Sequence, residues 1–127
     1  MICQNITYGA NRLIGTAYPP VEEFLLHEKA GHILASLFSE IGEIDKKYRE
    51  TFGLPPQPEF SNTYVQQDDE FPLCDRFVNA AKFYLASFII LEVDESRADT
   101  FYEKYCDSMC SIINSIPAVL EQTSNVY

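Results

Sequence analysis

The chain has 127 residues, of which 46% are hydrophobic, and a formal net charge of −10. This length fits one domain, residues 1–127, that buries roughly two-thirds of the surface of its unfolded chain. Because 19 acidic residues outnumber 9 Lys and Arg residues, the composition argues against a surface that grips nucleic-acid phosphates. An acidic surface either keeps a protein soluble or lets DNA slide past without sticking.

The sequence begins without a basic region followed by an apolar run, so no signal peptide is expected. Its longest apolar run, 83–91, is too short to span a bilayer, and we expect no membrane contact. The cysteines do not follow the spacing of a secreted disulfide framework, which favours a reducing cytoplasm. They are Cys3, Cys74, Cys106 and Cys110.

Residues 1–18 are predicted to form an irregular N-terminal segment, because Gly9 and Gly15 interrupt any long helix. At most a short turn is expected between them, at Ala10–Ile14. A helix is predicted to begin near Pro20, since proline is tolerated in the first turn of a helix.

From Ala30 to Phe52 the apolar residues recur at gaps of three and four, which predicts a long amphipathic helix. Gly31 or Gly42 is expected to bend or break it, and Gly53 is expected to end it.

The segment 53–72 contains four of the seven prolines and is predicted to be a loop or an arm. We expect it to reach a neighbouring molecule and to become ordered only against that partner, because it is poor in core residues. Its candidate interaction residues are Phe60, Tyr64, Val65, Phe71, Asp68, Asp69 and Glu70.

The region 73–92 is apolar on nearly every face, so it is predicted to be a helix at the centre of the fold or between subunits. Asp94 is predicted to cap a last helix that runs to about Ser115. The tail 117–127 is predicted to be loose. Together these elements predict an all-α bundle of three to four helices, with a long loop or arm between the second and third main helices.

A search for chemistry finds no catalytic site. His27 and His32 are five residues apart, which turns their side chains about 140° away from each other on a helix, and no third metal ligand is visible. Cys106 and Cys110 share a helix face but are predicted to pack as small hydrophobic residues. No nucleophile elbow or phosphate loop is present. The chain is therefore predicted to be no enzyme and to need no metal or cofactor.

The second half of the chain carries a pattern of residue types. It consists of the acidic segment and turn 68–73, the apolar Ala80-Ala81-Lys82-Phe83-Tyr84-Leu85-Ala86-Ser87, the acidic link 92–95, and then Ala98, Phe101, Tyr102 and Tyr105. This pattern resembles the head-to-tail connector, or adaptor, proteins of tailed phages and prophages. In that family a Leu-Pro-like turn precedes the apolar helix, whereas here the order is Pro72-Leu73.

The resemblance implies a ring of identical subunits, a dodecamer, that docks on the portal protein and lines a DNA channel. It implies further partners: a tail-completion or other neck protein, and passing DNA that is not read for sequence. It places the protein in the neck of the virion, and in the host cytoplasm before assembly. The alternative is a non-catalytic helical protein–protein interaction or regulatory module of bacterial or prophage origin.

Overall fold

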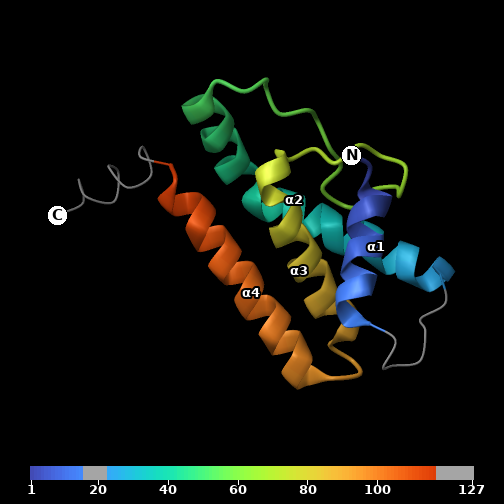
Figure 1. Ribbon diagram of the computed structural model, residues 1–127. Helices are drawn as coiled ribbons and strands as arrows, with labels where there is room; N and C mark the ends of the chain where they lie inside the picture. The colour runs from blue at the N-terminus through green and yellow to red at the C-terminus, as the bar shows by residue number, and fades with distance from the viewer. Residues whose placement is uncertain (16–22, 117–127) are drawn as a thin grey trace.

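Four α-helices form the chain's described part, residues 1–15 and 23–116 of a computed structural model (Figure 1). They are α1 (Cys3–Ile14), α2 (Glu23–Phe52), α3 (Val78–Ile90) and α4 (Glu95–Asn114), and a short 3₁₀ helix, η1 (Asp75–Phe77), precedes α3. The all-α prediction is confirmed, and so is the long segment between the second and third main helices. The predicted helix start near Pro20 and the tail 117–127 lie outside the described residues.

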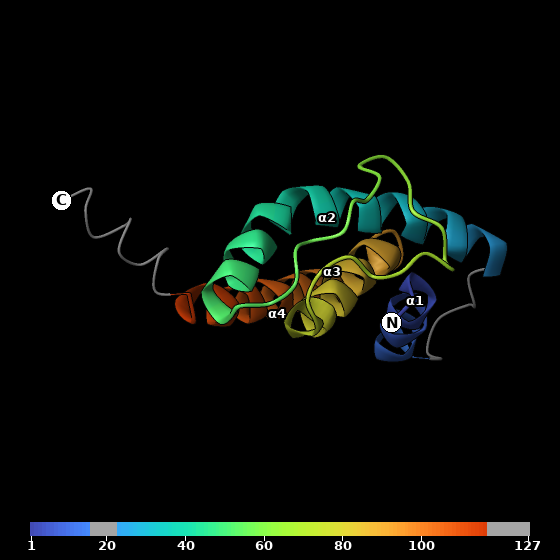
Figure 2. The ribbon, with the colours of Figure 1, turned by 90° about the horizontal axis from the view of Figure 1, so that it is seen from above.

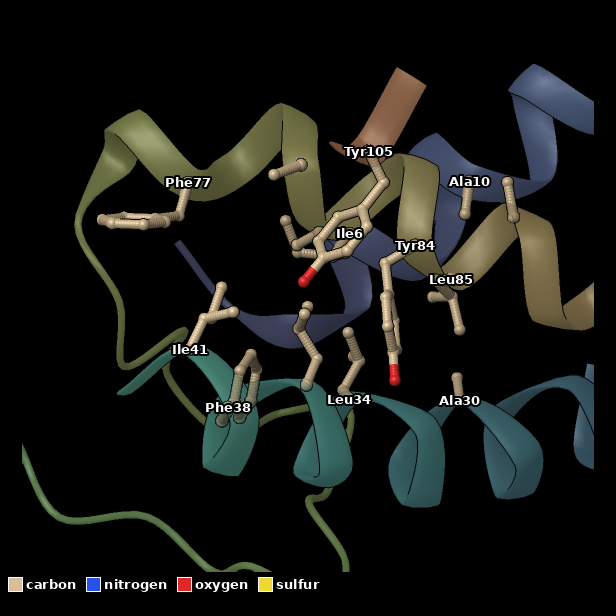
Figure 3. Close-up of a cluster of buried hydrophobic side chains, with 14 of the residues drawn as sticks. Ile6, Ala10, Ala30, Leu34, Phe38, Ile41, Phe77, Tyr84, Leu85 and Tyr105 are labelled. Atoms are coloured by element: carbon tan, nitrogen blue, oxygen red, sulfur yellow. The ribbon is translucent and has the colours of Figure 1, made fainter. Parts of the chain in front are cut away.

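Helix α3 is the centre of the fold, as its apolar sequence predicts. It packs against α1, α2 and α4, and α2 arches across it on one side (Figure 2). Figure 3 shows Leu34 and Phe38 from α2, Ile6 from α1, and Tyr84 and Leu85 from α3 gathered in the core. Eight of the thirteen residues of α3 are buried: Ala80, Ala81, Tyr84, Leu85, Ala86, Ser87, Ile89 and Ile90.

The prediction of an irregular segment at residues 1–18 is wrong for residues 3–14, which form α1. This helix continues through Gly9, although a glycine inside a helix costs about 1 kcal/mol relative to alanine. Burial of one helix face outweighs that cost, because α1 packs directly on α3. The buried residues are Cys3, Ile6, Thr7, Ala10 and Ile14.

Helix α2 runs unbroken through both of its internal glycines. Each glycine marks a place where the following segment lies close to the helix. A Cβ atom at Gly31 would come within 2.6 Å of the backbone oxygen of Val65, and one at Gly42 would touch the Phe60 ring at 3.4 Å. The glycines therefore allow close approach of the 53–72 segment and do not act as helix breaks.

Individual hydrogen bonds mark where α3 and α4 begin. Cys74 is extended, and its N–H donates to Asp45 of α2, so the α-helical part begins at Val78, later than predicted. At the other end, Asp94 caps α4, as predicted, by accepting a hydrogen bond from the N–H of Arg97 at 3.0 Å. The α3–α4 turn places these two helices side by side in opposite directions (Figure 1).

Candidate interaction surface

The histidines show no metal-binding arrangement among the residues that the structure describes. His32 is exposed, its Nδ1 lies 3.1 Å from the carbonyl oxygen of Thr63, and its ring contacts Tyr64 edge-on. No group of three His, Cys, Asp or Glu residues within 1–15 and 23–116 could hold a metal ion. The side chain of His27 lies outside the described residues.

The cysteines divide into two inner and two outer thiols. Cys106 and Cys110 are exposed on the outer face of α4, so the prediction that they pack as small hydrophobic residues is wrong. The inward face of α4 is already filled by larger residues such as Phe101, Tyr105 and Met109. Cys3 is buried and Cys74 is partly buried; burial raises the pKa of each of these two thiols to about 11.

The predicted interaction residues of the 53–72 segment separate into apolar and acidic groups. Val65 and Phe71 are buried in the chain's own core. Phe60 packs on Phe38, with ring centroids 5.8 Å apart, and Tyr64 lies over Gly31. The structure thus shows the segment packed against its own domain, contrary to the prediction that it becomes ordered only against a partner.

The acidic residues Asp68, Asp69 and Glu70 are exposed. Their backbone lies against the N-terminus of α1, where the carbonyl of Asp69 accepts a hydrogen bond from the N–H of Cys3 at 2.8 Å. The neighbouring carbonyl of Gln67 accepts from the N–H of Gln4 at 2.8 Å. The first free N–H groups of α1 are thereby satisfied. The three carboxylates lie on the surface, and that of Asp69 also accepts a hydrogen bond from the N–H of Gln66 at 2.8 Å.

One buried carboxylate, which the sequence patterns did not reveal, holds this segment in place. Asp45 has no exposed surface, and its oxygens accept hydrogen bonds from Arg49 Nε at 2.8 Å, Gln57 Nε2 at 2.9 Å and Cys74 N at 2.8 Å. The Arg49 guanidinium also donates to the carbonyls of Pro55 at 2.7 Å and Pro72 at 3.0 Å. Asp45 and Arg49 therefore join both ends of the segment to α2.

Large apolar side chains are exposed where α3 turns into α4. Four of them have exposed fractions between 42% and 57%, namely Phe88, Leu91, Val93 and Tyr102. We call these four residues the corner patch. Three of them, Phe88, Leu91 and Tyr102, line a cavity of about 110 Å³ together with Ser87, Ala98 and Asp99. Single exposed apolar residues are ordinary, whereas several exposed together in one region are typical of interaction sites.

A second apolar surface lies at the C-terminal end of α2. Phe52 and Leu54 retain 50% and 41% of their surface, and a cavity of about 380 Å³ opens beside Leu54. We call this cavity the end groove. It is lined by Lys46, Arg49, Glu50, Leu54, Pro56 and Gln57.

None of the described helices is both long enough and apolar enough to cross a membrane. The chain matches no protein-family model, no curated protein and no solved structure.

Proposed function

We propose that this chain is a subunit of a phage or prophage head-to-tail adaptor, which assembles into a ring beneath the portal protein. The residues that carry the resemblance to this family fall largely in α3 and α4. Tyr84 and Tyr105 from this set contact each other in the interior, with ring centroids 5.0 Å apart. The part of the pattern after residue 78 therefore belongs to one packed helical hairpin, which supports reading that part as a structural unit.

The corner patch is the observation that carries the proposal. The hairpin buries most of its large apolar residues yet leaves Phe88, Leu91, Val93 and Tyr102 half exposed at its turn. Apolar surface that is exposed to water costs free energy, which contact with another protein recovers. An exposed apolar surface of this kind fits a protein that works by contact, such as a ring subunit.

The acidic charge supports the channel part of the proposal. A ring of subunits that each carry a formal charge of −10 repels phosphate, so DNA passes without binding. The exposed carboxylates of Asp68, Asp69 and Glu70 are candidates for this lining or for contact with a basic partner.

Two measurements test the proposed function. The purified protein is mixed with the portal protein encoded nearest to its gene, and the mass of the complex is measured by native mass spectrometry. We expect a ring of several copies on one portal assembly, and we expect Val93→Glu to weaken it. The matched control is Leu13→Glu, which adds the same charge at a half-exposed apolar position on α1.

A protein that never binds the portal, alone or at high concentration, would contradict the adaptor role. Capture of a different protein through the corner patch would then favour the alternative, a helical protein–protein interaction module. Equal loss of portal binding in the Val93→Glu and Leu13→Glu variants would show that the added charge, and not the corner patch, weakens the complex.

A further inference from the structure

The cavity in the corner patch combines small buried residues, aromatic rings and one carboxylate. Ser87 and Ala98 are buried, and the exposed Phe88 and Tyr102 line the same cavity as the exposed Asp99. A guanidinium group suits this combination, because it stacks on aromatic rings and donates paired hydrogen bonds to a carboxylate. The cavity therefore has the chemistry of a site for an arginine side chain.

The carboxylate in this cavity belongs to a row of four exposed carboxylates along α4, which we call the acidic stripe. Glu95, Asp99, Glu103 and Asp107 follow one another at intervals of four residues, so they lie along one side of the helix. The structure gives them no hydrogen bond or ion pair among residues 1–15 and 23–116. Like charges at this spacing destabilise a helix, and a basic partner would relieve their repulsion.

The basic residues of α4 do not neutralise the acidic stripe, because they make contacts elsewhere. Arg97 donates to the carbonyl of Ile14 at 2.8 Å, and Lys104 lies over the Phe83 ring, with its Nζ 5.8 Å from the ring centroid. The acidic stripe meets the corner patch at Asp99, which lines the cavity. The two features therefore form one surface that is apolar at one end and negatively charged along its length.

The charge of the whole chain favours a different, basic protein as the occupant of this surface. Each copy of the chain carries a formal net charge of −10, so a second copy would be repelled. Nucleic-acid phosphates would be repelled for the same reason. A positively charged segment of another protein would instead be attracted along the whole acidic stripe.

We propose that the corner patch and the acidic stripe together dock a basic segment of a partner protein, which inserts an arginine side chain beside Asp99. The proposal rests on the proposed function and deepens it, because it gives the chemistry of the portal segment that the corner patch would contact. The rings and Leu91 supply the apolar part of the contact, and the carboxylates supply its charge.

A short fluorescein-labelled peptide, in which arginines alternate with leucines and alanines, tests the site directly. Its matched control carries citrulline in place of arginine, which removes the charge and keeps the shape. Fluorescence anisotropy measures the Kd of each peptide for the wild-type chain, Asp99→Asn, Tyr102→Leu and the control variant Glu59→Gln. Glu59 is exposed on the 53–72 segment, so this control loses the same charge away from the site. Circular dichroism verifies that the variants fold.

We expect the arginine peptide to bind more tightly than the citrulline peptide, and its binding to weaken as salt rises. Asp99→Asn should raise the Kd about tenfold, because it removes a charge-assisted hydrogen bond. Tyr102→Leu should raise it about threefold, through loss of the cation–ring contact, and Glu59→Gln should leave it close to the wild-type value. The same order of effects is expected when the portal protein replaces the peptide.

Failure of the arginine peptide to bind, equal Kd values for the two peptides, or equal losses in Asp99→Asn and Glu59→Gln would overturn the proposal. Self-association of the chain that Asp99→Asn abolishes in sedimentation velocity would make a second copy the occupant, and would overturn it too. Portal binding that neither salt nor Asp99→Asn weakens would overturn the docking chemistry and leave the adaptor role standing. Arginine-peptide binding that depends on Asp99, without any portal binding, would support the docking site and contradict the adaptor role.

Discussion

Removal of the Asp45 carboxylate is expected to cost a large part of the folding free energy. In Asp45→Ala the Arg49 guanidinium, whose side chain is only 12% exposed, loses its counter-charge. The N–H of Cys74 and the amide of Gln57 also lose an acceptor. Breaking a buried ion pair by removing one partner costs about 3–5 kcal/mol. The total free energy of unfolding of a domain of this kind is about 5–15 kcal/mol.

Arg49→Met should cost a similar amount, because it leaves a buried carboxylate without its counter-charge and removes the hydrogen bonds to the carbonyls of Pro55 and Pro72. The double variant Asp45→Ala/Arg49→Met leaves no unpaired charge. We therefore expect its loss to be smaller than the sum of the single losses by about 2–3 kcal/mol.

Urea unfolding measures these values, followed by far-ultraviolet circular dichroism and by the fluorescence of the tyrosines, since the chain has no Trp. The control is Glu43→Ala, which removes the exposed pair with Lys46 at 3.2 Å and should cost about 0–1 kcal/mol. A loss below about 1 kcal/mol in Asp45→Ala, or single losses that add within about 0.5 kcal/mol, would refute the reasoning.

Three further predictions concern the glycines and the thiols. Gly31→Ala should lower the melting temperature, because the new methyl group meets the backbone oxygen of Val65. Gly9→Ala should not lower it, since the new methyl group meets only the flexible side chain of Lys82. Equal changes in melting temperature for the two variants would contradict this reasoning. At pH 8 a disulfide reagent should modify the exposed Cys106 and Cys110 quickly and Cys3 and Cys74 slowly, with all four reacting in urea; four fast native thiols would be the contrary result. The free energy of unfolding should fall as pH rises from 9 to 11, because burial raises the pKa of Cys3 and Cys74 to about 11. The folded chain then keeps protons that the unfolded chain releases near pH 9. Cys3→Ala should reduce the slope of melting temperature against pH, and an unchanged slope would count against the reasoning.

Strong local signals were sufficient to predict the centre of the fold. Helix α3 is apolar on most faces, and Asp94 is followed by Glu95 and an apolar stripe, so neither element needed tertiary information. Helix α1 was missed because Gly9 and Gly15 are local helix-breaking signals. Its formation depends on packing against α3, about seventy residues later, which no local pattern reveals.

The candidate surfaces were less predictable for the same physical reason. The sequence predicts contact with a partner for Phe60, Tyr64, Val65 and Phe71. A proline-rich segment has no helical periodicity from which to predict which of its side chains are buried in the chain's own core. Their partner is α2 of the same chain, and this contact depends on Gly31 and Gly42. Asp45 looked like one polar residue in an amphipathic helix, and only the folded chain shows that its carboxylate is buried.

The position of Arg49 has a consequence for how this protein can vary. Its guanidinium donates to the carbonyls of residues 55 and 72 and so brings the two ends of this span together, while Gln57 and Val65 hold the span to α2 between those ends. The entropy of closing a loop grows only slowly with its length, by about 0.6 kcal/mol for each doubling. Extra residues inserted near the exposed Asn62 would therefore lengthen a closed loop at small cost, which makes this tip a place where the chain can acquire new contacts without rebuilding its helices.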